Sequence, residues 1–96
     1  MDTIVALATA RGRAGVAVVR VSGPQSWKVC ARLAGRVPRP RVASLCVLRD
    51  SDGERLDEAL VLVFEAGGSF TGEQVVEFQT HGSPAIITAL IREILL

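Results

Sequence analysis

The segment 16–22, VAVVRVS, constrains the fold most, because it reads as a β-strand with a single charge in an apolar run. Successive side chains of a strand point to opposite faces, so Arg20 shares one face with the residues two positions away and the other face is apolar. The segment 73–80 has the reciprocal pattern, with Glu77 between apolar neighbours. A buried charge is costly unless it is paired. Both charges therefore need partners or ligands.

Two interpretations fit this pattern. In the first, Arg20 and Glu77 form an internal ion pair that only supports the fold. In the second, both side chains line a mostly apolar pocket for a flat polar ligand. A carboxylate can accept two parallel N–H bonds from the edge of a heterocycle, and a guanidinium suits a carboxylate or a carbonyl group. The residues alone leave both interpretations open.

The remaining segments predict an α+β domain with the element order β-β-α-β-β-β-α. We expect a small mixed or antiparallel sheet with two helices. The near-continuous apolar run of the fourth strand predicts burial on both of its faces. The second helix is expected to reach Leu96 without a cap, which suggests a fragment of a longer protein. The expected strands are 3–9, 16–22, 43–49, 57–65 and 73–80. The first expected helix, 24–34, is capped by Ser22 or Gly23 and ends at Gly35. The second, 84–96, is capped by Ser83.

Length and composition narrow the class of protein. The chain has 96 residues, of which 49% are hydrophobic, which suits one small domain with an aliphatic core. No apolar run approaches the roughly 20 residues that span a bilayer, and no secretion pattern is present, so we expect a cytoplasmic location and no membrane partner. Cys30 and Cys46 are expected to be free thiols. With one histidine, His81, the chain predicts no metal site and no catalytic residue.

The charges are divided unevenly along the sequence. Residues 3–49 carry nine basic residues and no acidic ones, whereas residues 50–96 carry nine acidic and two basic residues. The two halves can complement each other within the chain or across a dimer. The basic half can also attract anions such as RNA phosphates. The alternative is a solvated surface of mixed charge.

Two glycine-bearing loops, 12–15 and 68–73, suggest nucleotide binding at first sight. A phosphate-binding loop needs a Gly-Lys-Ser/Thr ending followed by a helix, and both loops lead into strands instead. We interpret them as tight turns that require positive φ angles. His81 lies between a strand and a helix, and we interpret it as a hydrogen-bonded structural residue.

Several short motifs occur in a fixed order along the chain. They are Asp2–Ala6 (DTIVA), Ala8–Thr9, Gly15–Val16, Arg20–Gly23 (RVSG), Ser69–Glu73 (SFTGE), Val76–Glu77 and His81–Gly82. No single motif would be specific, but the combination is. With these motifs the chain resembles, from Asp2 to its end, the start of the tRNA modification GTPases called MnmE or TrmE.

The resemblance implies that residues 1–96 are an N-terminal domain with the tetrahydrofolate-binding fold of the glycine-cleavage T-protein. It implies a homodimer formed through this domain and a bound 5-formyl- or methylene-tetrahydrofolate. Members of the family act with a flavoprotein of the MnmG type to modify carbon 5 of the wobble uridine in tRNA. Their GTP, Mg and K ions belong to a separate G domain, so this fragment is expected not to hydrolyse GTP.

Residue by residue, the resemblance implies that Arg20 and Glu77 contact the folate. A further ligand-contacting lysine, the cysteine motif and the P-loop of the family would lie beyond Leu96. The chain departs from the family pattern at Gln74, usually Asp, at 65–68, which lacks the usual proline, and at Ser83, usually Gly. The alternatives to a folate-binding module are a purely structural dimerisation scaffold and an RNA-binding domain that uses the basic half.

Overall fold

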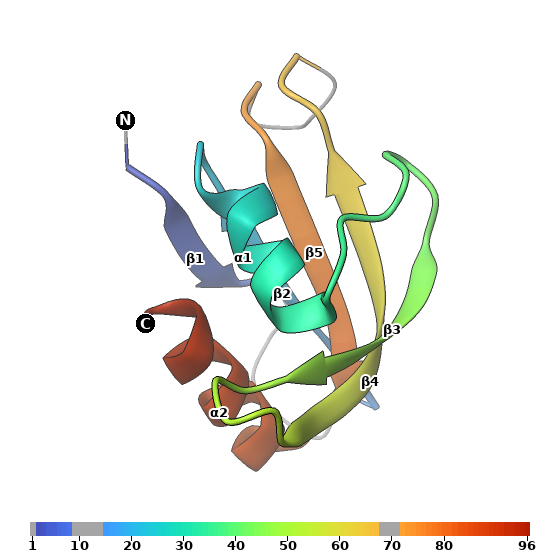
Figure 1. Cartoon of the computed structure of the whole chain (residues 1–96), viewed down its shortest axis with the longest axis vertical. Helices are drawn as coiled ribbons and strands as arrows, with labels where there is room; N and C mark the ends of the chain where they lie inside the picture. The colour runs from blue at the N-terminus through green and yellow to red at the C-terminus, as the bar shows by residue number, and fades with distance from the viewer. Residues whose placement is uncertain (1, 9–14, 68–71) are drawn as a thin grey trace.

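The computed structural model describes residues 2–8, 15–67 and 72–96, and it confirms an α+β fold with the predicted element order (Figure 1). Alternating patterns rich in β-branched residues form the strands, and the two segments with helical apolar spacing form the helices. The elements are β1 (Ile4–Leu7), β2 (Val16–Ser22), α1 (Ser26–Ala34), β3 (Ser44–Arg49), β4 (Arg55–Phe64), β5 (Val75–His81) and α2 (Pro84–Ile94).

The five strands form one sheet in the order β1-β2-β5-β4-β3, and every neighbouring pair is antiparallel. Of the two possibilities left by the sequence, mixed or antiparallel, the described strands take the second. The central pair is β2 and β5, whose register sets Val19 opposite Phe78. Two strands that are distant in sequence therefore lie side by side in the middle of the sheet.

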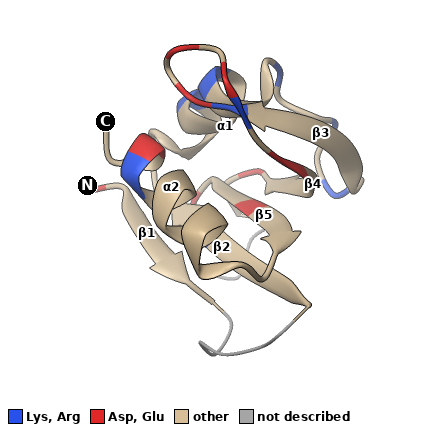
Figure 2. Ribbon diagram, turned by 90° about the horizontal axis from the view of Figure 1, so that it is seen from below, with Lys and Arg blue, Asp and Glu red and all other residues tan. Residues whose placement is uncertain are grey.

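Both helices cover the same face of the sheet. Helix α1 packs on β3 and β5, and α2 packs on β2, β4 and β5. Figure 2 shows the pair of helices along one side of the strands. The core between these layers is aliphatic around one aromatic ring, as the composition predicts. Its fully buried members include Val19, Val21, Cys30, Leu48, Val61, Val63, Val76, Phe78 and Leu90.

The prediction that the fourth strand is buried on both faces is wrong. Burial alternates along β4, so that Val61 and Val63 are fully buried whereas Leu60 is 41% exposed. The reason is that the described helices cover one face only, and the opposite face carries no second layer of described residues. We call this second side the open face. Because β4 also carries apolar side chains on the open face, its sequence has the near-continuous apolar run that is typical of a strand covered on both faces.

Several predicted boundaries shift. Helix α1 has Gln25 as its N-cap, without a side-chain cap, because the chain first turns with a backbone bond from the Ser26 N–H to the Gly23 carbonyl. Strand β1 ends at Leu7, and β5 begins at Val75, two residues later than predicted. Helix α2 ends at Ile94 rather than at Leu96, because the chain there closes into a turn.

Other boundary predictions hold. Gly35 ends α1 in the left-handed conformation, with φ of 77°, and Ser83 is the N-cap position of α2, although its side chain makes no capping bond. Gly72 has the predicted positive φ, 78°. The same prediction is wrong for Gly15, whose φ is not positive and which leads directly into β2. Most of the two glycine-bearing loops, residues 12–14 and 68–71, lies outside the described residues.

Gly23 allows β1 to approach the start of α1. Its φ is 131°, and a Cβ atom built there would lie 2.6 Å from the Cα of Thr3. The hydroxyl of Thr3 accepts a hydrogen bond of 2.9 Å from the N–H of Gln25. The glycine thereby lets the N-terminal strand contact the β2–α1 turn directly.

The cysteines are free and buried, as expected. Burial raises the pKa of Cys30 to about 11, helped by the nearby Cys46 and opposed by Arg36. Among the described residues no three potential metal ligands lie together. No helix in the described ranges has the length and apolarity needed to span a bilayer.

Candidate functional site

The two charges singled out from the sequence meet at the centre of the open face. Arg20 on β2 and Glu77 on β5 are direct partners in the antiparallel register. The Arg20 guanidinium donates from Nε and Nη2 to Oε2 of Glu77, over 2.9 and 2.7 Å. The Arg20 side chain is 36% exposed and the Glu77 side chain 16%. The pair is therefore reachable from solvent.

Apolar side chains flank the pair on its own face. In an antiparallel sheet, residues directly opposite one another point to the same side. The register sets Ala6 of β1 opposite Arg20 and Leu62 of β4 opposite Glu77. Val18, two residues before Arg20 on β2, lies on the same face. A polar pair thus lies within a largely apolar surface, which is the composition of a small-molecule site.

The ion pair leaves part of its bonding capacity unused. Both guanidinium donors go to the same carboxylate oxygen, Oε2 of Glu77. In the described part of the chain no hydrogen bond uses Oε1 of Glu77 or Nη1 of Arg20. An ionised carboxylate has about four acceptor positions and a guanidinium five donors. The pair can therefore exist as an internal ion pair and still offer an acceptor and a donor.

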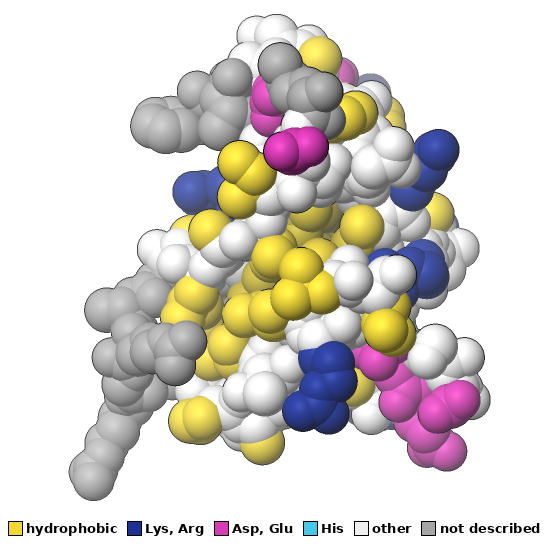
Figure 3. All heavy atoms as spheres, turned by 90° about the vertical axis from the view of Figure 1, so that its left-hand side faces the viewer, with side chains coloured by type: hydrophobic (Ala, Val, Ile, Leu, Met, Phe, Trp, Pro, Cys, Tyr) yellow, Lys and Arg dark blue, Asp and Glu magenta, His cyan; other side chains and the backbone are white. Residues whose placement is uncertain are grey.

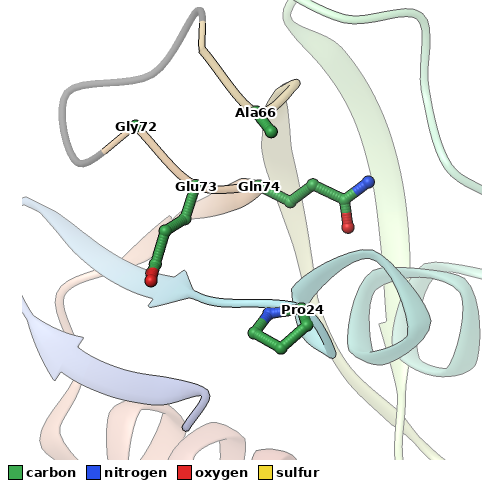
Figure 4. Close-up of a pocket in the computed structure, with 5 residues that line it drawn as sticks. All are labelled: Pro24, Ala66, Gly72, Glu73 and Gln74. Atoms are coloured by element: carbon green, nitrogen blue, oxygen red, sulfur yellow. The ribbon is translucent and has the colours of Figure 1, made fainter. Parts of the chain in front are cut away.

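A hollow lies just beyond the end of β2 and before the start of β5. It has a volume of about 380 Å³ and is lined by Pro24, Ala66, Gly72, Glu73 and Gln74. Figure 4 shows the side chain of Glu73 extending toward β2 and that of Gln74 extending to the other side. Ser22 donates to Oε2 of Glu73 over 3.1 Å, and the N–H of Gly23 donates to the Gln74 carbonyl over 2.9 Å. Ser22 shares one face of β2 with Arg20, so the bond from Ser22 to Glu73 links the strand that carries Arg20 to the lining of the hollow.

His81 is hydrogen-bonded, as predicted, and its partner is Asp57. The buried Asp57 carboxylate accepts the backbone N–H of His81 over 2.9 Å and contacts its ring Nδ1 over 2.8 Å. Burial would raise the pKa of Asp57, but the bonds from His81 and from the backbone of Glu58 outweigh burial and hold that pKa below its usual value. The sequence did not single out Asp57, because an acid at the start of a strand resembles a turn residue.

Among the described residues, the basic and the acidic half of the sequence form two ion pairs with each other. Besides Arg20 and Glu77, Arg41 lies 3.8 Å from the carboxylate of Glu65 and 5.5 Å from the ring centre of Phe64. In Figure 2 the charged residues gather around α1 and the β3–β4 hairpin. Part of the basic half is thus paired within the chain.

The fold and the site define a class: a small α+β domain with a charged pair on an uncovered sheet face. The family described as "GTP-binding protein TrmE N-terminus" matches residues 3–96. The chain is 60% identical over 98% of its length to the tRNA modification GTPase MnmE of Dinoroseobacter shibae. It is 57% identical, over 94% of its length, to the proteins of that name from Halorhodospira halophila and Caulobacter vibrioides.

The chain therefore belongs to the TrmE, or MnmE, family of tRNA modification GTPases and corresponds to its N-terminal region. It covers 22%, 19% and 20% of these three relatives, which is about a fifth of their length.

Proposed function

We propose that this chain is the folate-binding and dimerisation domain of a tRNA-modifying GTPase, and that it holds a one-carbon tetrahydrofolate at Arg20 and Glu77. The observation that carries the proposal is the joint position of these side chains on the open face, within a largely apolar surface. Among the described residues no hydrogen bond occupies Oε1 of Glu77 or Nη1 of Arg20. Membership of the family supports it independently.

The donor set fits a reduced folate. Oε1 of Glu77 can accept N–H bonds from the 2-amino-4-oxo edge of the pterin, and the guanidinium of Arg20 can donate to a carbonyl or carboxylate oxygen. Leu62 and Val18 provide apolar surface for the ring. When bound, 5-formyl- or methylene-tetrahydrofolate supplies a one-carbon unit, and the role of this chain is to bind and orient it.

The internal ion pair does not compete strongly with a ligand. A partly exposed pair of this kind contributes about 0–1 kcal/mol to stability, because solvent screens the attraction between the two charges. A ligand that replaces part of the Arg20–Glu77 contact therefore gives up little. This argument favours a binding role over a purely supporting one.

Calorimetric titration of 5-formyl-tetrahydrofolate tests the proposal, with the full-length protein as well as with this chain. Arg20→Ala and Glu77→Ala should each weaken binding about 10- to 150-fold, as expected for the loss of a charged hydrogen bond worth about 1.5–3 kcal/mol. Lys28→Ala is the matched control, because Lys28 is an exposed charge on α1. Unchanged affinity in both variants, or no binding by the full-length protein, would refute a folate site here and favour a structural scaffold.

A charge exchange separates binding from support. In Arg20→Glu/Glu77→Arg the two charges trade places, so an ion pair can re-form across the same register. If the pair only supports the fold, the double variant should recover the free energy of unfolding that Arg20→Glu and Glu77→Arg each lose, and ligand binding should not depend on any of these changes. If the pair recognises the pterin, stability recovers but binding of 5-formyl-tetrahydrofolate stays lost.

The open face also supports homodimerisation, with a second copy of this chain as its cover. Of the eight large hydrophobic residues that are exposed in the described part of the chain, four lie on this face by register, namely Ile4, Val16, Leu45 and Leu60. Leu45→Lys/Leu60→Lys should shift a dimer toward monomer in analytical ultracentrifugation, whereas the exposed Val37→Lys, on the α1–β3 connector, should not. A dimer unaffected by the first variant would place the interface elsewhere.

For the whole protein we propose GTP-dependent modification of the wobble uridine of tRNA together with a flavoprotein of the MnmG type. The relatives are named tRNA modification GTPases, and the sequence here contains no Gly-Lys-Ser/Thr phosphate loop. Arg20→Ala in the full-length protein should therefore keep its GTP hydrolysis and lose tRNA modification. Loss of GTP hydrolysis itself would contradict the separation of the two sites.

A further inference from the structure

Strand β1 forms one edge of the sheet, and on its outer side no strand of the described residues pairs with it. The N–H of Ala8 donates to the carbonyl of Val18, which makes this a hydrogen-bonded pair of the antiparallel ladder. Such pairs alternate with pairs whose N–H and C=O groups point away from the partner strand. The outward groups of β1 are therefore those of Val5 and Leu7, at the edge of the sheet. An edge of this kind is a template for another strand.

The surface beside this edge is apolar. The side chains of Val5, Leu7 and Ile91 are only partly buried although they pack against the core. Figure 3 shows hydrophobic side chains across the middle of this side of the molecule, where β1 and α2 lie. A strand laid along β1 would place alternate side chains under α2, in contact with this apolar surface. One added strand could therefore both pair with the backbone of β1 and cover the apolar surface beside it.

The topology indicates which strand can occupy the edge. Because β2 is antiparallel to both β1 and β5, β1 and β5 are parallel to each other. Helix α2 leaves the end of β5, crosses the covered face and ends on the side of β1 (Figure 1). A strand that follows such a helix runs parallel to β5, and a position beside β1 gives the right-handed crossover found in about 98% of cases.

We propose that, in the longer proteins of this family, the chain that follows Leu96 forms a strand parallel to β1 and completes a six-stranded sheet beneath α2. The relatives supply the chain required, because this sequence covers 22% of the Dinoroseobacter protein and matches the N-terminal region of the family. The inference rests on β1 and α2, and it does not depend on folate binding at Arg20 and Glu77.

Amide hydrogen exchange of the full-length protein and of residues 1–96 tests the proposal. In the full-length protein the Val5 and Leu7 amides should exchange at least about tenfold more slowly than in residues 1–96, because they acquire ladder hydrogen bonds. Amides of β2 and β5 report in both samples whether the sheet is folded. Rapid exchange at both positions in the full-length protein would overturn the proposal. Equal protection in the two samples would also overturn it, since a second copy or the sheet itself would then cover the edge.

A proline variant keeps the test decisive if residues 1–96 do not fold alone. Val5→Pro removes one outward N–H and leaves the inward bonds of β1 intact. In the full-length protein it should speed the exchange of the Leu7 amide, if a strand is bound there. Ala6→Pro, which removes an inward N–H, controls for general loss of β1. No effect of Val5→Pro at Leu7 would overturn the proposal.

Discussion

Gly23→Ala is expected to destabilise the protein by about 2–4 kcal/mol. Two costs combine at this position. At φ of 131° the backbone conformation is unfavourable for an alanine, at about 1–3 kcal/mol. In addition, the new methyl group would lie 2.6 Å from the Cα of Thr3, which is backbone and cannot rotate away, so β1 must move. That movement loses the bond from Gln25 to the Thr3 hydroxyl, worth about 0.5–1.5 kcal/mol.

Gly35→Ala is the matched control. Gly35 also has a positive φ, of 77°, but nothing lies within 4 Å of an added Cβ atom. Its cost should be the conformational term alone, about 1–2 kcal/mol. The difference between the two variants therefore measures the close approach of β1 to the β2–α1 turn.

Urea unfolding followed by tryptophan fluorescence is a suitable assay. Trp27 is the only tryptophan, and its indole N–H donates to the carbonyl of Phe64, so its emission reports on the contact between α1 and the sheet. For a domain of this size, each kcal/mol also lowers Tm by roughly 4–8 °C. Equal losses in Gly23→Ala and Gly35→Ala, at unchanged m-values, would refute the argument that β1 packs against Gly23.

Three further outcomes are expected. The folded-state pKa of Asp57 is below its ordinary value of 3.8. The ionised Asp57 therefore contributes fully to stability above about pH 4, and this contribution is lost as the pH falls through the folded-state pKa. In Asp57→Asn, a plot of unfolding free energy against pH should accordingly be flatter below about pH 4 than in the unchanged protein. Cys30 and Cys46 should react with a thiol reagent only after unfolding, since both are buried and burial raises the pKa of Cys30 to about 11; fast reaction of the native protein would contradict this. Phe78→Ala should cost about 3–5 kcal/mol in chemical unfolding, because its ring is fully buried at the centre of the sheet; a loss under about 1 kcal/mol would contradict the placement of the core.

Local patterns in the sequence predict the elements and the faces well. Alternation within 16–22 and 73–80 sets Arg20 and Glu77 apart from the core, and the structure confirms that both lie on the less buried face of their strands. What alternation cannot supply is register. The two residues are 57 positions apart, and a slip of one residue between β2 and β5 would place them on opposite faces.

Where the sequence misleads, the cause is a contact that lies far along the chain. The apolar run of β4 suggests two covers, but whether a face is covered depends on helices from other segments. The bond from the His81 N–H to the Asp57 carboxylate likewise joins the end of one strand to the beginning of its neighbour. Neither residue shows in its local pattern that it has this partner.

The energetics of the open face connect the fold to the proposed function. A partly exposed ion pair adds little to stability, and exposed leucines such as Leu45 and Leu60 add less than buried ones. The helix-covered face contains the large buried side chains and is sufficient to account for a folded sheet. The side chains of the open face therefore contribute little to folding, and their arrangement is better explained by what binds there. Substitutions at Arg20 and Leu60 should accordingly change binding or association far more than the free energy of unfolding, whereas substitutions at Phe78 should do the reverse.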